Sequence, residues 1–147
     1  MAIALKMAQI AAKKDEVPVG AVIVRNGAVI AKAHNMRETK RNPLAHAELL
    51  AISKASRKLR GWRLTGCTLY VTLEPCPMCA GAIVNARIDK VIFGAYDPKA
   101  GACGTLYNLT EGRLNHTPEV TGGVMEEETA AVLKDYFKKK RSAEKSK

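Results

Sequence analysis

The chain has 147 residues, 47% of them hydrophobic, so it is long enough to bury an ordinary core in one domain without disulfide staples. Its net charge of +10 favours a polyanionic partner such as nucleic acid over a small neutral metabolite. The apolar residues 1–12 are too few, and too interrupted by Lys6 and Gln9, to cross a membrane.

Half of the charge lies at the C-terminal end. Residues 134–147 hold seven Lys or Arg against two acidic residues, a net +5, and the rest is spread over the body. A basic end is more often a solvated helix terminus than a binding arm. We therefore expect a single domain of residues 1–147 that carries a basic C-terminal helix and tail at about residues 126–147.

The first part of the chain predicts a helix, a hairpin and a second helix. Apolar residues at helical spacing predict an amphipathic helix over residues 2–13. Two strands, residues 17–24 and 28–33, flank Asn26-Gly27, a strong two-residue hairpin turn. Proline is tolerated in the first turn of a helix, so Pro43 predicts a helix that runs to about Leu59.

The remaining segments alternate between strand and helix. Residues 68–73 predict a strand, which Pro75 ends just before a helix, and residues 90–95 and 119–124 predict two more strands. Residues 106–109 predict a short helical turn. Acidic residues 126–128 open a last helix with a basic end, the order of charge that the helix dipole favours. This alternation predicts a sheet covered on both faces.

Residues 76–79 (CPMC) supply two cysteines three residues apart, which is half of a zinc site. On a helix, Cys76 and Cys79 share one face. His46 adds a third protein ligand and leaves one position for water, as in a catalytic rather than a closed structural zinc site. Both segments begin helices, and strand-to-helix junctions gather in one crevice in open α/β sheets. We therefore expect these three residues to bind one metal ion.

Glu48 lies two residues after His46, near enough to share the site and free to carry protons. In hydrolytic deamination at zinc, such a carboxylate takes a proton from the water and passes protons to the ring nitrogen and to the leaving ammonia. The H-x-E and P-C-x-x-C pattern is the general signature of the zinc-dependent base deaminases.

Other uses of the cysteines stay open. A redox pair would leave His46 and Glu48 without a role, and a structural zinc knuckle would need a fourth ligand, which Cys67 or Cys103 would have to supply. We expect Cys67 to be a core residue and Cys103 a loop residue. Four cysteines with this spacing favour metal binding over disulfides, and so a reducing cytoplasm.

Four segments together resemble the bacterial tRNA-specific adenosine deaminases, of the cytidine deaminase-like superfamily. They are residues 16–22 (EVPVGAV), 45–48 (AHAE), 68–76 with 78–82 (TLYVTLEPC and MCAGA), and 91–95 with Asp97 (VIFGA). The zinc motif alone indicates the superfamily, and the VTLEPC and FGA-x-D stretches narrow it. The resemblance implies an α/β fold, a three-layer α/β/α sandwich with a five-stranded mixed sheet, in a homodimer with one Zn²⁺ per subunit.

The resemblance also implies an activity and a set of site residues. The activity is hydrolysis of the wobble adenosine in a tRNA anticodon stem-loop to inosine, with zinc held by His46, Cys76 and Cys79 and protons moved by Glu48. The implied substrate-binding residues are Asn35 for the flipped nucleoside, the Ala47 backbone N–H for the base edge, Val17, Pro18 and Leu73 as apolar walls, and Asp97 beside the target nucleotide. A plainer reading has Asn35 capping a turn and Asp97 initiating one.

Three rival functions remain. The first is a deaminase of free guanine or cytosine, since the same motifs occur in that branch, but such an enzyme gains little from a charge of +10. The second is a non-catalytic zinc module that binds RNA, and the third is a structural partner in an editing complex. Both leave Glu48 without a role.

Overall fold

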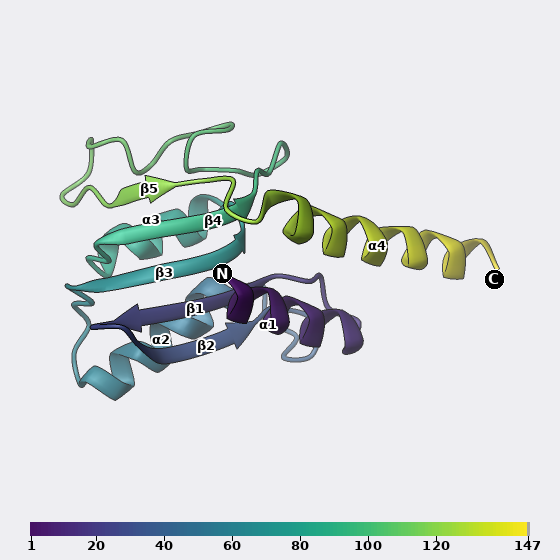
Figure 1. Ribbon diagram of the computed structural model, residues 1–147, viewed down its shortest axis with the longest axis horizontal. Coiled ribbons are helices and arrows are strands. Elements are labelled where there is room, and N and C mark those ends of the chain that lie inside the picture. The colour runs from purple at the N-terminus through teal and green to yellow at the C-terminus, as the bar shows by residue number, and fades with distance from the viewer. Residues whose placement is uncertain (147) are drawn as a thin grey trace.

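Residues 1–146, which the computed structural model describes, fold around one five-stranded mixed sheet (Figure 1). The strands are β1 (Gly20–Arg25), β2 (Ala28–His34), β3 (Cys67–Leu73), β4 (Lys90–Ala95) and β5 (Glu119–Thr121), in the order β2-β1-β3-β4-β5. β1 runs antiparallel to β2 and β3, whereas β3, β4 and β5 are parallel to one another. The carboxyl ends of β3 and β4 therefore meet at one edge of the sheet.

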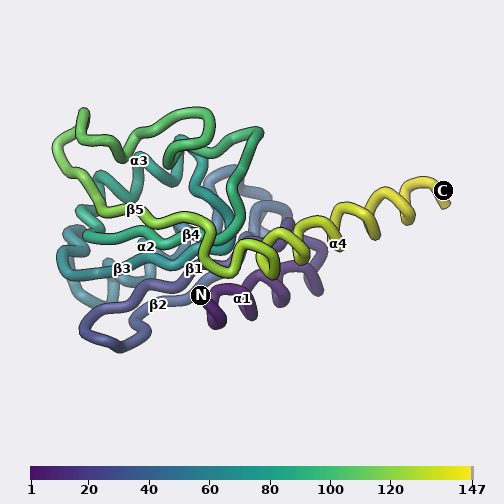
Figure 2. Tube along the Cα trace, turned by 45° about the horizontal axis from the view of Figure 1, so that its top comes forward, coloured from purple at the N-terminus to yellow at the C-terminus, as the bar shows by residue number. Residues whose placement is uncertain are grey.

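Two layers of helix cover the sheet. α1 (Ala2–Lys13) and α4 (Glu126–Lys145) lie on one face, and α2 (Ala47–Leu59) and α3 (Pro77–Asn85) lie on the other (Figures 1 and 2). The predicted three-layer α/β/α sandwich is confirmed. The helices pack closely because the residues that they bury are mostly small, such as Ala4, Ala8 and Ala11 of α1.

The hairpin between β1 and β2 has the turn that its sequence predicts. Asn26 and Gly27 both have positive φ, 51° and 76°, as a type I′ turn requires. A register shift between Ile23 and Val24 adds a bulge next to the turn. The strand begins at Gly20 rather than at residue 17, which leaves Val17 and Val19 free to border a cavity.

Two predicted elements are wrong. The second helix begins at Ala47 rather than at Pro43, because residues 42–46 form a turn in which the Asn42 side chain accepts a hydrogen bond from the Leu44 N–H at 2.9 Å. Residues 106–109 form no helical turn. Asn108 instead makes an isolated antiparallel bridge with Cys103, which folds this loop back on itself.

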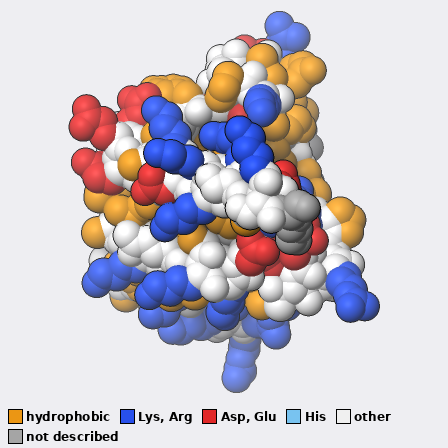
Figure 3. Space-filling view, turned by 90° about the vertical axis from the view of Figure 1, so that its right-hand side faces the viewer, with side chains coloured by type: hydrophobic (Ala, Val, Ile, Leu, Met, Phe, Trp, Pro, Cys, Tyr) orange, Lys and Arg blue, Asp and Glu red, His pale blue; other side chains and the backbone are white. Residues whose placement is uncertain are grey.

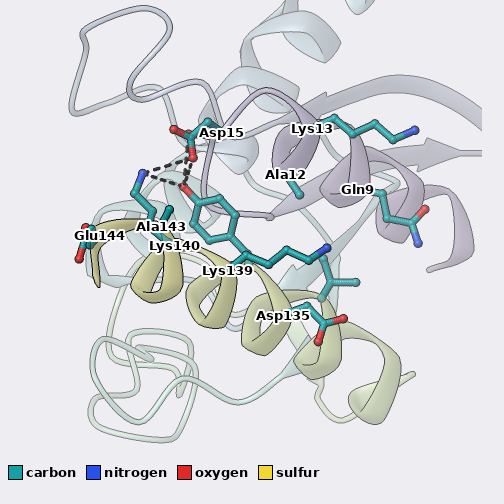
Figure 4. A pocket seen from close by; sticks show the side chains of 11 residues that line it. Gln9, Ala12, Lys13, Asp15, Asp135, Lys139, Lys140, Ala143 and Glu144 are labelled. Atoms are coloured by element: carbon teal, nitrogen blue, oxygen red, sulfur yellow. Dashed lines mark hydrogen bonds and ion pairs between the residues drawn. The ribbon is translucent and has the colours of Figure 1, made fainter. Parts of the chain in front are cut away.

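The C-terminal helix α4 is tied by polar contacts to Asp15, just after α1 (Figure 4), and then leaves the domain (Figures 1 and 2). The Tyr136 hydroxyl and the Lys140 ammonium each donate a hydrogen bond to Asp15 Oδ1, at 3.1 and 3.3 Å. Beyond this contact the helix projects into solvent. The face of the molecule toward which α4 points carries many Lys and Arg side chains, with acidic side chains in smaller groups (Figure 3).

Among residues 1–146, the structure has no helix that is both long enough and apolar enough to span a bilayer.

The packing of α1 on β1 depends on Gly20. A Cβ at this position would collide with the carbonyl oxygen of Ala4 and would lie 2.6 Å from the Ala8 nitrogen. We expect Gly20→Ala to lower the free energy of unfolding by about 1–3 kcal/mol, as overpacking of a rigid core does. Urea denaturation measures this. Gly61→Ala is the matched control, because a Cβ there meets nothing within 4 Å, and equal stability of the two variants would contradict the prediction.

Candidate metal centre and its cavity

Two helices begin next to predicted metal ligands. His46 is the N-cap of α2 and Cys76 the N-cap of α3, each with an extended backbone (φ −74°, ψ 150° and φ −75°, ψ 174°). Neither side chain caps its own helix by a hydrogen bond. Both side chains are therefore available to the crevice between the helix N-termini and the end of β3.

The structure brings the three predicted ligands together. His46 Nδ1 lies 3.7 Å from Cys76 Sγ and 3.5 Å from Cys79 Sγ, and all three donor atoms lie within 4.8 Å of one another. Two sulfurs and an imidazole nitrogen form a donor set for a transition metal ion rather than for Mg²⁺ or Ca²⁺. The cluster is thus compatible with a bound metal ion.

The surroundings of Cys76 favour its thiolate form. A hydrogen bond from Cys79 and a second from His46 lower the pKa of the Cys76 thiol to about 4. The same sulfur raises the pKa of His46 by its hydrogen bond to the ring. The pKa of the Cys79 thiol rises because of its hydrogen bond with Cys76 and because it is buried. Thiolates are the form in which cysteines bind metals.

Glu48 lies in the first turn of α2 and is 4% exposed. Burial raises the pKa of its carboxyl to about 7, and the negative charge of Cys76 adds to this effect. A carboxyl whose pKa is near neutrality both accepts and donates protons readily, which suits general acid and base catalysis.

A cavity of about 160 Å³ opens beside the cluster. Its lining residues are Val17, Val19, Asn35, Arg37, His46, Ala47, Glu48, Leu73, Glu74, Cys76, Asp97 and Ala100. Every predicted site residue is among them except Cys79 and Pro18, which are buried and do not line the cavity.

Four lining residues were missed in the sequence. Val19 alternates with Val17 and had a detectable signal, since residues two apart in an extended segment face the same side. Glu74 had one as well, since it lies between the predicted site residues Leu73 and Cys76. Arg37 and Ala100 had none that is local, because they reach the cavity through the folding of two loops.

Asn35 and Asp97 both make the turn contacts that the plainer reading expected. Asn35 Nδ2 donates to the Val17 carbonyl at 3.2 Å, and its Oδ1 accepts from the Arg37 N–H at 3.1 Å. Asp97 Oδ1 accepts from the N–H groups of Lys99 and Ala100, at 2.9 and 3.2 Å. Each side chain therefore shapes the cavity wall in which it lies.

Cys67 and Cys103 lie outside the cluster, as expected of a core residue and a loop residue. Cys67 begins β3 and is fully buried, whereas Cys103 is 8% exposed in the loop after β4. Burial raises the pKa of the Cys103 thiol to about 12. In the described part of the chain, the metal-ligand cluster holds His46, Cys76 and Cys79 and no fourth donor.

The loop of residues 36–45 is fixed by a buried carboxylate. Glu16, which is fully buried, accepts hydrogen bonds from the N–H groups of Glu38 and Thr39 at 3.0 and 2.7 Å and from the Thr39 hydroxyl at 2.6 Å. This loop carries Arg37 at the cavity and leads directly into His46. Glu16 therefore sets the approach of the chain to the cluster.

A comparison with protein families identifies the class of protein to which the chain belongs. The family model of the MafB19-like deaminases matches residues 1–141. The chain is thus a deaminase by family, in agreement with its fold and with the cluster beside Glu48.

Individual relatives define the family more narrowly. A tRNA-specific adenosine deaminase of Bacillus subtilis (strain 168) is 56% identical, over 97% of this chain and 92% of its own length. A solved structure from work on A-to-I editing by tRNA:A34 deaminases at the wobble position of transfer RNA aligns with a TM-score of 0.85 at 43% identity, over 90% of this chain and 97% of that one. The chain belongs to the family of tRNA-specific adenosine deaminases.

Guanine deaminases share the fold at lower identity. The guanine deaminase from Nitrosomonas europaea aligns with a TM-score of 0.82 at 25% identity, over 92% of this chain and 81% of that one. The free-base branch is therefore the more distant one.

The Glu16 contacts predict a pH-dependent stability. Burial alone would raise the pKa of Glu16, but hydrogen bonds from Thr39 and Glu38 outweigh it and hold the pKa below its ordinary value. A lowered pKa stabilises the fold above the unfolded value of about 4.3, and this contribution is lost as pH falls through the folded pKa. We expect Glu16→Gln to cost about 1–3 kcal/mol at pH 7 and less at pH 3, by urea denaturation.

Glu119→Gln is the control for Glu16, because Glu119 forms an exposed ion pair with Lys90 at 3.8 Å, and such pairs contribute little. A cost for Glu16→Gln that is the same at both pH values would contradict the assignment.

Proposed function

We propose that this chain hydrolyses the wobble adenosine of a tRNA anticodon stem-loop to inosine, with release of ammonia. The observation that carries the proposal is the buried Glu48 carboxyl, which lines the same cavity as the metal-ligand cluster. The 56% identity to a tRNA-specific adenosine deaminase supports the choice of substrate.

The ion that fits the cluster is Zn²⁺, one per chain. In a tetrahedral zinc site with Zn–S and Zn–N bonds of about 2.3 and 2.0 Å, sulfur and nitrogen ligands lie about 3.5 Å apart. The two distances from His46 Nδ1 to the cysteine sulfurs are 3.7 and 3.5 Å. His46, Cys76 and Cys79 would hold the ion and leave one position open, and zinc supplies Lewis acidity that lowers the pKa of water there.

Glu48 moves the protons. Its carboxylate accepts a proton from the attacking water and passes it to the purine ring nitrogen as the bond to C6 forms. It then accepts the proton of the new C6 hydroxyl and passes it to the amino group, so that the C6 carbonyl forms as the C6–N bond breaks and ammonia leaves. Glu48 lines the same cavity as the metal-ligand residues, so this one carboxyl can serve first as base and then as acid. Burial also keeps bulk water from exchanging with the proton in transit.

The remaining lining residues bind the base. Val17 and Leu73 form apolar walls, and Pro18, which follows Val17 in the chain, is buried and does not line the cavity. Asn35 and the Ala47 N–H hydrogen-bond the flipped nucleoside, and Asp97 contacts the nucleotide backbone or ribose at the rim. A flipped base held in this way is the general solution for chemistry on a nucleic-acid base.

Charge supports an RNA substrate over a free base. Arg37 lines the cavity, and Lys40 and Arg41 are exposed three and four residues further along the same loop. Cations in this position neutralise phosphates that flank a flipped nucleotide.

As part of the proposal, the chain is a single deaminase domain that acts as a homodimer in the cytoplasm.

The test offers tRNA, guanine and cytosine side by side to the zinc-loaded protein. We expect inosine in the tRNA and no turnover of either free base, measured by mass spectrometry of nuclease digests. Glu48→Ala is the control, and its rate should fall by at least about 10³-fold while fold and zinc content stay unchanged. Deamination of guanine in place of tRNA would move the chain to the free-base branch, and full activity of Glu48→Ala would refute the mechanism.

The assignment of zinc predicts a stoichiometry. We expect one zinc per chain by elemental analysis, and loss of tight binding in Cys76→Ala because one of three protein ligands is gone. Cys103→Ala is the matched control, a cysteine at least as well buried as Cys76 that lies outside the cluster. Equal zinc content in the two variants would exclude Cys76 as a ligand.

A further inference from the structure

We propose that Glu74 is a positioning residue, which holds the loop of residues 97–105 as one wall of the cavity and acts on substrate binding through Asp97. The part of this inference that concerns substrate rests on the proposed function. The part that concerns the loop rests on the contacts alone.

The Glu74 carboxylate is 2% exposed and accepts four hydrogen bonds from one loop. Oε1 accepts from the Asp97 N–H at 3.1 Å and from the Thr105 hydroxyl. Oε2 accepts from the N–H groups of Cys103 and Thr105, each at 3.1 Å. Three of the four donors are backbone groups, so the carboxylate fixes the path of the chain rather than one side chain.

The loop packs around this carboxylate without spare room. A Cβ at Gly101 would collide with the Glu74 side chain and would lie 2.6 Å from the Asp97 carbonyl oxygen. Backbone hydrogen bonds also hold the chain at Glu74 and at its neighbour. The Glu74 N–H donates to the Ala95 carbonyl at 2.9 Å, and the Pro75 carbonyl accepts from the Ala102 N–H at 2.8 Å.

Its place in the chain connects this loop to the chemistry. Leu73, just before Glu74, lines the cavity, and Cys76, two residues after it, is a proposed zinc ligand. On the other side, Asp97 and Ala100 of the loop line the same cavity. Glu74 therefore joins the wall formed by the loop to the strand end that carries the metal centre.

Replacement by glutamine breaks one of these contacts selectively. Glutamine is isosteric but offers one acceptor oxygen. With that oxygen toward the Cys103 and Thr105 N–H groups, its NH₂ donates to the Thr105 hydroxyl and faces the Asp97 N–H, which loses its acceptor. Glu74→Gln thus releases the amide of Asp97 first.

The first measurement is amide hydrogen exchange by NMR, which needs no substrate. We expect the Asp97 amide to exchange about tenfold faster in Glu74→Gln, equivalent to roughly 1.4 kcal/mol. Amides in the core strands and the zinc content should stay unchanged. Unchanged exchange at Asp97 overturns the proposal, whatever the substrate of the chain proves to be.

The second measurement separates positioning from a general structural role. For an anticodon stem-loop, we expect Glu74→Gln to raise KM about tenfold and to change kcat by less than about threefold, because the metal centre stays intact. Glu119→Gln makes the same charge change on an exposed strand and should leave KM at the wild-type value. In an Asp97→Ala background, the effect of Glu74→Gln on KM should shrink, because Glu74 is proposed to act on the substrate through the Asp97 side chain, which alanine removes.

Gly101→Ala gives an independent variant that keeps Glu74 but forces the loop away from it. Faster exchange at Asp97 together with a raised KM supports the proposal, and wild-type exchange and KM overturn it. A fall in kcat with loss of zinc in both variants also overturns it, since that would place Glu74 in support of the metal centre. Absence of inosine with the wild-type protein would refute the proposed function instead, and hydrogen exchange would still decide the role of Glu74.

Discussion

The candidate site depends on the meeting of two helix N-termini at the end of a central strand. His46 and Cys76 occupy N-cap positions, where the backbone is still extended and neither side chain makes a capping hydrogen bond to the helix that follows. The partial positive charge of the two helix ends favours thiolates in the crevice, which donate to a metal. Glu48 follows in the first turn of α2, so the same helix start supplies both a ligand and a proton carrier.

The sequence was informative where local rules decide the structure. The bounds of α1 and β4 and the start of α4 follow from periodicity and from the order of charge, and Asn26-Gly27 determines the first hairpin. The three metal-ligand residues were recognisable from their types and spacing, because few other functions use this combination.

The sequence was uninformative where partners are far apart in the chain. The late start of α2 depends on the side chain of Asn42, which stabilises a turn that competes with the helix. The cavity walls depend on Glu16 and Glu74, whose hydrogen-bond partners lie 22 to 31 residues away. No periodicity marks such contacts, so Arg37 and Ala100 were not expected at the cavity. Pro18 was expected in the wall and is instead buried next to it.

Most of α4 lies away from the metal centre and is structurally independent of it. Of its 20 residues, Thr129 in the first turn is buried, and beyond the contacts of Tyr136 and Lys140 with Asp15 the helix projects into solvent. Substitutions in its outer turns therefore leave the sheet and the metal centre undisturbed. The outer turns of α4 can therefore change in sequence, or carry a fused second domain, without altering the metal centre. Such changes would alter which distant parts of a partner the molecule contacts.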